Sequence, residues 1–182
     1  ERQMENNQEI IRLENLSKTF ELRYHKTLRA VDAVSLSLHK GVCTAVVGES
    51  GCGKSTLARM AALLEPVTEG AIYYKGQQIG GIKEGQPMSI RGEALRAYRR
   101  HVQMIFQDPV NVFSPRMKIG TFLMEPWIHF EKKTKKEARA LALYSLRRVH
   151  LGEEYFDKYP HQLSGGELQR IAIARAISLH PE

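Results

Sequence analysis

Nine consecutive residues of this chain combine the side chains and the backbone freedom that phosphate binding requires. They run from Gly48 to Thr56 in the pattern glycine, four residues, glycine, lysine, then serine or threonine. Glycines let the backbone curl so that successive amide groups face a bound anion, and a helix beginning near Lys54 would add its positive end. We therefore predict that all nine bind phosphate groups: Gly48, Glu49, Ser50, Gly51, Cys52, Gly53, Lys54, Ser55 and Thr56.

Three side chains of this loop have distinct predicted roles. Lys54 should contact the β and γ phosphates of a nucleotide, Ser55 offers a hydroxyl ligand for Mg²⁺, and Thr56 would support a phosphate nearer the base. The alternative is a chance match, expected in roughly one chain in a hundred of this length. The predicted strand before the loop and the predicted helix after it argue against chance. The loop alone does not say which nucleotide is bound or which reaction follows.

A second pair of glycines opens the last predicted helix of the chain. Ser164 and Glu167 have the spacing of a capping box, which is a purely structural reading of this segment. A cap does not require two glycines, however, whereas bare amides at a helix start allow an anion to approach closely. We therefore predict a second phosphate contact made by four residues: Ser164, Gly165, Gly166 and Glu167.

Together the two motifs resemble the ATP-binding cassette (ABC) family. The interval between Lys54 and Ser164 matches the usual spacing of that family's phosphate loop and its LSGGQ-type signature. The resemblance implies that two cassettes pair head to tail, so that the signature helix of one closes over the γ phosphate held by the other. Glu167 stands where the family more often has glutamine. The implied cofactors are ATP and Mg²⁺.

Two further positions match the family. Gln107 resembles the Q-loop glutamine, which implies a contact with Mg²⁺ and the attacking water and, with Lys54, a catalytic role. The plain alternative is an ordinary residue at a strand end. Phe20 aligns with the aromatic residue that stacks on adenine, although a lone phenylalanine near a strand end is often buried in a core.

The segment around Gln107 points to one branch of the family. Residues 106–117 resemble the FQDP stretch of cassettes that serve oligopeptide, dipeptide and nickel importers, and Pro115 and Arg116 fit that pattern. Val112 and Ser114 depart from it, where serine and asparagine are usual. Residues 159–162 are a typical lead-in to the signature. The resemblance covers nearly all of the chain from residue 10 onward.

The resemblance implies an α/β fold of the P-loop type, in which one parallel core sheet is flanked by an N-terminal antiparallel region and a helical subdomain. Apolar residues alternate at period two in the first predicted strands, which suggests half-buried antiparallel pairing. Strand-like segments are expected at residues 10–16, 31–38, 42–47, 71–74, 79 and 102–106. The runs at 42–47 and 102–106 are short and mainly apolar, as in strands covered on both faces.

Helical periodicity predicts the other elements. Helices are expected at residues 54–64, 93–100 and 164–178, and residues 119–149 are expected to be a mostly α-helical region. Residues 80–92 carry four glycines and a proline and are predicted to be a surface excursion. We assign residues 10–182 to one cassette domain, with a helical subdomain at about 110–165 and an N-terminal tail at 1–9.

The family pattern continues, after the segment matching residues 179–182, into a strand ending in Asp and Glu, the Walker B segment. The resemblance assigns Mg²⁺ and water activation to those carboxylates. We therefore expect this stretch to be part of a longer active ATPase. By itself it should show no turnover, because those carboxylates are needed for it. It should also bind ATP weakly and aggregate, because an apolar sheet edge would be exposed.

Composition narrows the partners. The chain has 182 residues, 42% of them hydrophobic, and a formal net charge of +7. Seven basic residues fall on or beside one helical pattern, which favours a solvated face over nucleic-acid binding. They are Lys132, Lys133, Lys135, Lys136, Arg139, Arg147 and Arg148. Cys43 and Cys52 lack metal or disulfide spacing and are predicted to be free thiols.

The longest apolar runs fall far short of the roughly 18 to 20 residues that cross a bilayer. We predict a cytoplasmic chain, peripheral on the inner face of the cell membrane. The resemblance implies a second cassette, membrane permease subunits and, indirectly, an extracytoplasmic solute-binding protein as partners, and no nucleic acid.

Two other functions are open at this point. The chain could be a non-hydrolysing, nucleotide-binding regulatory module derived from a cassette. It could also belong to a soluble cassette ATPase of translation or DNA repair, although such proteins normally bring a second cassette or a long coiled-coil insertion, and neither is present in this sequence. The transported solute cannot be read from this subunit.

Overall fold

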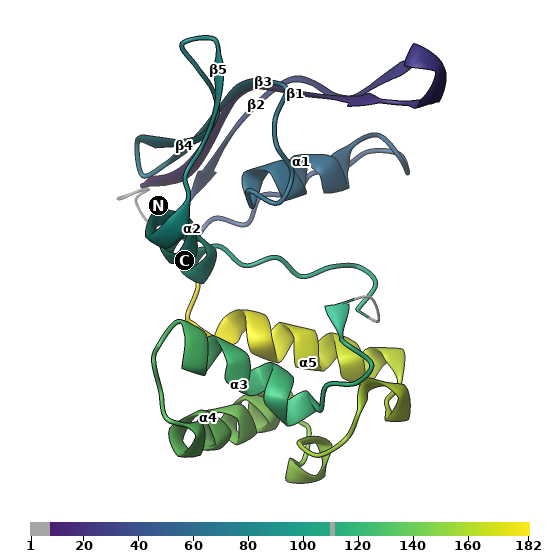
Figure 1. Ribbon diagram of the computed structural model, residues 1–182, viewed down its shortest axis with the longest axis vertical. Coiled ribbons are helices and arrows are strands. Elements are labelled where there is room, and N and C mark those ends of the chain that lie inside the picture. Colours follow the sequence, from purple (N-terminus) through teal and green to yellow (C-terminus); the bar gives the residue numbers. More distant parts are fainter. Residues whose placement is uncertain (1–7, 110–111) are drawn as a thin grey trace, which may run out of the picture. The chain divides into compact units, whose positions relative to one another are not determined.

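The computed structural model describes residues 8–109 and 112–182 and divides into two compact units, Glu1–Ala94 and Leu95–Glu182 (Figure 1). Residues 1–7 of the predicted tail, and residues 110 and 111 at the predicted start of the helical subdomain, lie outside the described residues. Glu9, assigned to the tail, already belongs to the first strand.

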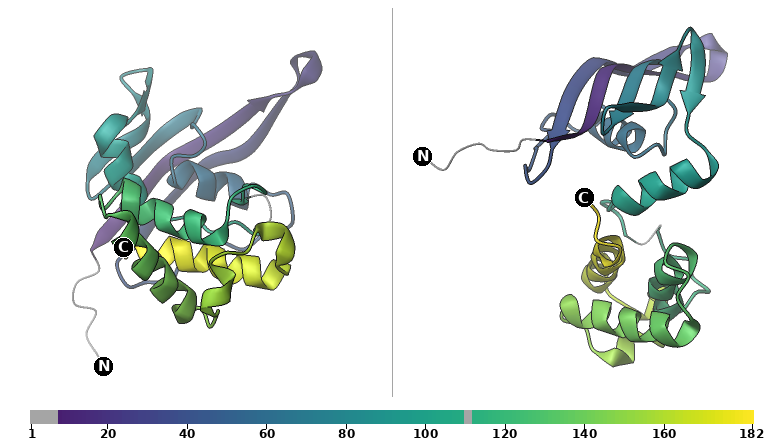
Figure 2. Two further views of the ribbon diagram at one scale, coloured as in Figure 1. Left: turned by 60° about the horizontal axis from the view of Figure 1, so that its bottom comes forward. Right: turned by 90° about the vertical axis from the view of Figure 1, so that its left-hand side faces the viewer.

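The first unit is an antiparallel sheet with one helix. Its strands pair in the order β2-β1-β3-β4-β5, and every pairing is antiparallel (Figure 2). The bounds are β1 (Glu9–Glu21), β2 (Thr27–His39), β3 (Glu69–Tyr74), β4 (Gln77–Lys83) and β5 (Gln86–Ser89). The predicted antiparallel pair at 10–16 and 31–38 is confirmed, and both strands are longer than predicted, joined through the short 3-10 turn η1 (Arg23–His25).

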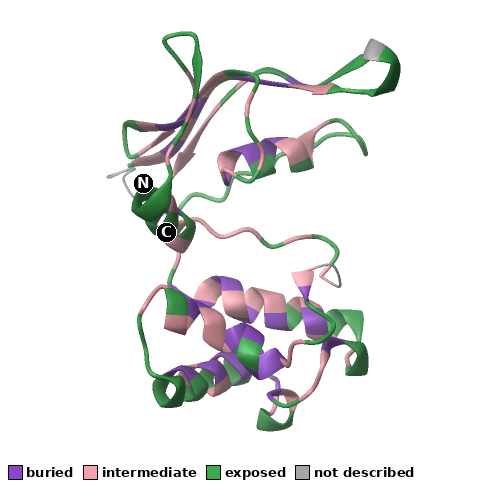
Figure 3. Ribbon diagram, viewed as in Figure 1, coloured by how far each residue is buried: buried purple, intermediate pink, exposed green. Residues whose placement is uncertain are grey.

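Helix α1 (Lys54–Ala61) packs on β1 and β2 with its apolar side. Leu57 and Met60 are its buried residues, and they join a core to which β1 contributes Ile11, Leu13 and Leu16 (Figure 3). The alternation that predicted β1 is therefore the alternation between this core and the other face of the sheet. The packing matters for function because it fixes where α1 begins.

The glycine-rich segment 80–92 is not a surface excursion, and that prediction is wrong. β4 continues to Lys83, and β5 returns beside it after a turn at Glu84 and Gly85, both at positive φ (51° and 77°). Gly81 lies inside β4, where a Cβ would come within 2.3 Å of the Gly70 carbonyl oxygen of the neighbouring strand. Glycine here permits close approach between strands rather than marking a loop.

The parallel strands predicted at 42–47 and 102–106 are also not formed. Both segments lack strand pairing in the described part of the chain. Val46 is 48% exposed and Val47 is 87% exposed, although their side chains are typical of buried strands. Apolar, β-branched residues favour a strand only where neighbouring strands supply hydrogen bonds and cover, and neither segment has such neighbours among the described residues.

The second unit is helical. α2 (Gly92–His101) crosses the boundary between the units, and α3 (Ile119–His129), α4 (Lys135–Arg148) and α5 (Gly165–Ser178) follow, with 3-10 turns η3 (Glu153–Tyr155) and η4 (Pro160–Gln162) before α5. The mostly α-helical region predicted at 119–149 is confirmed and contains α3 and α4, because Thr134 starts a new helix as an N-cap. Its hydroxyl accepts from the Glu137 amide while the Glu137 carboxylate accepts from the Thr134 amide.

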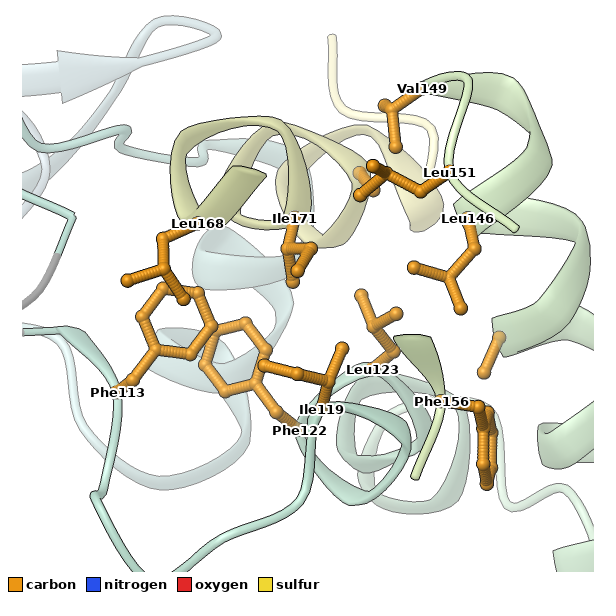
Figure 4. Close-up of a cluster of buried hydrophobic side chains, with 12 residues drawn as sticks. Phe113, Ile119, Phe122, Leu123, Leu146, Val149, Leu151, Phe156, Leu168 and Ile171 are labelled. Atoms are coloured by element: carbon orange, nitrogen blue, oxygen red, sulfur yellow. The ribbon is translucent and has the colours of Figure 1, made fainter. Parts of the chain in front are cut away.

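An apolar cluster joins α3, α4 and α5 (Figure 4). Ile171 of α5 and Leu146 of α4 are fully buried in it, and the rings of Phe113 and Phe122 lie with centroids 4.4 Å apart. Arg175 of α5 also donates to the Phe122 carbonyl oxygen at 2.8 Å. These contacts hold α5 rigidly against α3, and so fix the position of its first residues within this unit.

Candidate nucleotide-binding site

The start of α1 leaves backbone donors available. Gly53 is its N-cap residue, in a left-handed conformation (φ 96°), and no described side chain caps the helix there. Leu57 is the first helical residue whose amide donates to a backbone oxygen, that of Gly53 at 2.9 Å. The amides of Lys54, Ser55 and Thr56 therefore have no acceptor inside the helix, which is the arrangement that binds anions.

Gly53 is sterically required at this position. A Cβ there would lie 2.1 Å from the carbonyl oxygen of Ala30 and 3.4 Å from the Val31 side chain, both in β2. The positive φ adds a second reason for glycine. The end of the phosphate loop is thus pressed against a strand, which positions the first turn of α1.

The rest of the predicted loop curls around the Lys54 side chain. The Lys54 ammonium donates to the carbonyl oxygens of Gly48 and Glu49 at 2.8 and 2.5 Å, and Cys52 Sγ lies 3.5 Å away. Gly51 has φ 83°, and the Cys52 amide lies 3.4 Å from the Glu49 oxygen that it faces. Residues 48–52 are exposed. A positive group and several amides therefore gather in one accessible loop.

Phe20 lies in the same unit, on β1 opposite Leu28 of β2. Its side chain is half-buried, so it is not a core residue, and the Lys18 ammonium lies 4.8 Å from the ring centroid. Lys18 is held in place by Glu65 at 2.6 Å and by the Pro66 carbonyl oxygen at 2.8 Å. The Phe20 ring is partly accessible, and its stacking on adenine stays a prediction.

The start of α5 is built differently, by the predicted capping box. The Ser164 amide donates to the Glu167 carboxylate at 2.7 Å, and the Glu167 amide lies 3.4 Å from the Ser164 hydroxyl oxygen that accepts from it. Tyr155 was not foreseen: its hydroxyl donates to the same carboxylate at 2.5 Å. No local pattern could have identified it, because the contact depends on how η3 folds back toward α5.

These contacts set the protonation of Glu167. The hydrogen bond from Tyr155, followed by the backbone and side-chain bonds from Ser164, lowers the pKa of Glu167 from 4.5 to about 2. The same hydrogen bond raises the pKa of the Tyr155 phenol. Glu167 is therefore a carboxylate at neutral pH and can accept from both residues at once, which a glutamine side chain could do only through its single oxygen.

Gly165 and Gly166 have no steric reason to be glycine. Both are exposed, neither has positive φ, and a Cβ on either would meet no heavy atom of the described chain within 4 Å. Alanine would fit and would favour the helix by as much as about 1 kcal/mol at an interior position. Access of a phosphate group to the helix start at Gly165 and Gly166 stays a prediction.

Gln107 is exposed, at the end of the extended segment that precedes α3. It belongs to the second unit with Ser164, Gly165 and Gly166, whereas the phosphate loop and Phe20 belong to the first. Each unit therefore carries one of the two predicted helix starts. The metal-coordinating and catalytic roles of Gln107 stay predictions.

Comparison with known proteins decides the family. The sequence profile described as ABC transporter matches residues 31–182. The chain belongs to the ABC transporter family. Among curated relatives, this cassette chain is 43% identical over 155 residues to the dipeptide transport ATP-binding protein DppF of Haemophilus influenzae, with 85% of this chain and 45% of the relative covered.

The match to a second relative covers a larger share of this chain. The oligopeptide transport ATP-binding protein AppF of Bacillus subtilis is 39% identical over 184 residues, which cover 97% of this cassette chain and 54% of AppF. The chain thus spans about half the length of the curated relatives that it matches.

A solved structure agrees with the fold. A dimer of the ATP-binding cassette MJ0796, in a post-hydrolysis state with ADP and Pi bound, superposes with a TM-score of 0.81 at 28% identity. The superposition covers 94% of this cassette chain and 71% of that one. The family fold is therefore shown, although the parallel strands expected at 42–47 and 102–106 are not formed here.

Other side chains of the cassette chain bear on metal binding, thiol chemistry and surface charge. Within the described ranges, no group of three or more His, Cys, Asp or Glu side chains could hold a metal ion. Cys43 and Cys52 are exposed free thiols, as predicted. The seven basic residues predicted on a solvated face are all exposed. Within residues 8–109 and 112–182, none of the helices has the length and apolar character that a bilayer crossing needs.

Proposed function

We propose that this cassette chain binds ATP and forms the nucleotide-binding part of an ATP-hydrolysing motor subunit, in an importer of dipeptides or oligopeptides. The observation that carries the proposal is the pair of accessible helix starts, one uncapped at Gly53 and one with two glycines that the fold does not require. The named relatives are dipeptide and oligopeptide transport proteins, which favours peptides over nickel as the solute class.

The phosphate loop would hold the triphosphate. Its amides at the start of α1 point to the open end of the helix, and Lys54 is already beside them. On ATP binding, we expect the Lys54 ammonium to exchange the carbonyl oxygens of Gly48 and Glu49 for the β and γ phosphates, because a charged acceptor is stronger than a carbonyl. Ser50, Gly51, Cys52 and Gly53 would supply the curl of the loop.

We expect Mg²⁺ to bind at this end of α1 together with the nucleotide, and not in a site made of protein ligands alone. Ser55 has an exposed side chain in the first helical turn and would offer its hydroxyl, with phosphate oxygens and water as the other ligands. Gln107 would contribute an amide oxygen. When bound, the ion neutralises charge that develops on the phosphates. Phe20 would stack on the adenine, beside the fixed Lys18 ammonium.

The start of α5 would meet the γ phosphate of a nucleotide held by a second cassette. The Ser164 hydroxyl and the Glu167 carboxylate bond each other, so the cap is complete before any ligand arrives. The amides of Gly165 and Gly166 would then be the contacts available to phosphate. The solved cassette with ADP and Pi is a dimer, which supports pairing as the working arrangement.

Membrane permease subunits are the further partners that we propose, with a solute-binding protein acting through them. This would place the chain on the inner face of the cell membrane as a peripheral subunit. The peptide-transport relatives support this assignment. Nucleic acid is not proposed as a partner, because the matching family and the named relatives are transport proteins.

Nucleotide binding provides the direct test. With a fluorescent ATP analogue, Lys54→Ala should weaken binding about 10- to 100-fold, as expected for loss of one or two charge-assisted contacts. Lys40→Ala is the matched control, since Lys40 is exposed and lies outside the loop. Equal affinity of the Lys54 variant and the wild type would refute the proposed site.

A further inference from the structure

Four lysines gather around the start of α4. Lys132 and Lys133 precede the cap residue Thr134, and Lys135 and Lys136 follow it as the first helical residues. All four side chains are exposed. In the ranges 8–109 and 112–182, none of the four ammonium groups forms an ion pair with a carboxylate. We call these four residues the lysine cluster.

The two carboxylates closest in sequence are already engaged. Glu137 accepts hydrogen bonds from the Thr134 amide at 2.9 Å and from the Thr134 hydroxyl at 2.7 Å, and these bonds lower its pKa more than the nearby Lys133 charge does. Glu131 forms an ion pair with Arg100. The cluster also lies at the positive end of the α4 dipole, where added positive charge is unfavourable. An external anionic partner would relieve this local excess.

The outer face of α4 continues the surface. Ala138, Ala142 and Leu146 of α4 are buried, whereas Lys136 and Tyr144 are exposed. Tyr144 is 58% exposed. Lysine clusters are attracted to anionic headgroups, and tyrosine rings are enriched at membrane–water interfaces.

We propose that the lysine cluster and Tyr144 form a contact surface for anionic phospholipid headgroups. Lysine carries a compact, hydrated charge on a long flexible stem, which suits a diffuse anionic surface, whereas a defined carboxylate partner favours the fork of arginine. Tyr144 also lines a small cavity with Trp127 and His180, and the lining of that cavity includes none of the four lysines. This surface is independent of the nucleotide chemistry proposed above.

Flotation with vesicles on a density gradient tests the proposal, because aggregates of the chain do not float. The purified chain is mixed with vesicles of phosphatidylcholine alone, or with about one third phosphatidylglycerol, a fraction that gives a strongly negative surface. We expect binding to the anionic vesicles only, weakening as salt is added because the attraction is screened. Absence of binding to anionic vesicles at low salt would overturn the proposal.

A charge-matched pair of variants separates the cluster from overall charge. The test variant combines Lys132→Gln, Lys133→Gln, Lys135→Gln and Lys136→Gln. The control combines Arg23→Gln, Lys26→Gln, Lys40→Gln and Lys83→Gln, which are exposed residues of the first unit with the same summed charge. At about fivefold per lysine near the surface, the test variant should bind at least about a hundredfold more weakly. The control should lose far less.

Two further measurements complete the test: thermal unfolding of the glutamine variant and vesicle binding of Tyr144→Ser. The glutamine variant should unfold at the same temperature as the wild type or higher, because positive charge is removed from a helix start. Tyr144→Ser should weaken binding by roughly three- to tenfold through lost apolar contact. Equal losses in the test and control variants would overturn the proposal. So would binding of a labelled poly-glutamate peptide through the cluster without vesicle binding, which would make the surface a protein contact.

Discussion

The starts of α1 and α5 present backbone amides by opposite means. At α1 no described side chain caps the helix, and Gly53 is forced by a positive φ and by the Ala30 carbonyl oxygen. At α5 Ser164 and Glu167 form a capping box. A Cβ at Gly165 or Gly166 would meet no atom of the described chain within 4 Å. One glycine serves the fold and thereby the site. The other two serve no visible purpose in the fold.

This contrast makes stability and function separable in the two regions. Where geometry forces glycine, a substitution should damage folding and binding together. Where geometry leaves glycine unforced, a substitution should leave folding intact and reveal only the loss of a contact. The two helix starts therefore act as internal controls for each other.

The largest expected effect is that of Gly53→Ala. The new Cβ would meet the Ala30 oxygen at 2.1 Å in a left-handed backbone, so β2 or α1 must shift. We expect a loss of at least about 2 kcal/mol in the free energy of unfolding, measured by urea denaturation, and no measurable ATP binding. Gly51→Ala is a useful comparison, because its φ is also positive but its Cβ would lie in open space. An unchanged unfolding midpoint for Gly53→Ala would show that the loop is not seated on β2.

The double variant Gly165→Ala, Gly166→Ala should behave in the opposite way. Its unfolding free energy should stay within about 0.5 kcal/mol of the wild type or rise, because alanine favours a helix and fits both positions. ATP binding to the phosphate loop should persist, whereas ATP-dependent pairing, followed by analytical ultracentrifugation, should be lost. If the double variant paired as strongly as the wild type, Gly165 and Gly166 would not be contacts between paired cassettes.

The local parts of the site could be predicted from the sequence. The loop from Gly48 to Thr56 and the capping box at Ser164 are each a few residues long, and α1 and α5 begin where the motifs place them. Short-range hydrogen bonds and backbone torsions determine such features, so their residues are enough to identify them.

The predictions that were wrong, and the contacts that were not foreseen, depend on distant segments of the chain. Residues 42–47 have strand composition, but a strand needs neighbours that composition does not supply. Gly81 looked like a loop residue, yet it permits contact with β3. Tyr155 reaches Glu167 only through the fold of η3, and Ala30 constrains Gly53 from a strand far earlier in the chain. None of these contacts leaves a local pattern.

Acid should affect the two helix starts differently. The folded-state pKa of Glu167 is about 2, below its ordinary 4.5, so its contribution to stability is fully present above about pH 4.5 and is lost as the pH falls toward 2. α1 has no acidic residue in its first turn. Glu167→Gln should therefore flatten part of the decline in unfolding free energy over this window, measured by denaturation at several pH values. An unaltered slope would mean that Glu167 is not held as a carboxylate by the cap.

The smallest expected effect isolates the tyrosine from the cap. Tyr155→Phe removes the hydroxyl that donates to Glu167 at 2.5 Å but leaves both bonds with Ser164 in place. The pKa of Glu167 should rise toward its ordinary value, because the largest cause of its depression is gone, yet it should stay below 4.5 through the Ser164 bonds. Carbon NMR titration of the Glu167 carboxyl measures this, with Tyr144→Phe as the control, since Tyr144 is exposed on α4. If the two variants give the same Glu167 pKa, then Tyr155 does not hold this carboxylate, and the cap at Ser164 alone accounts for the difference between the α5 and α1 starts.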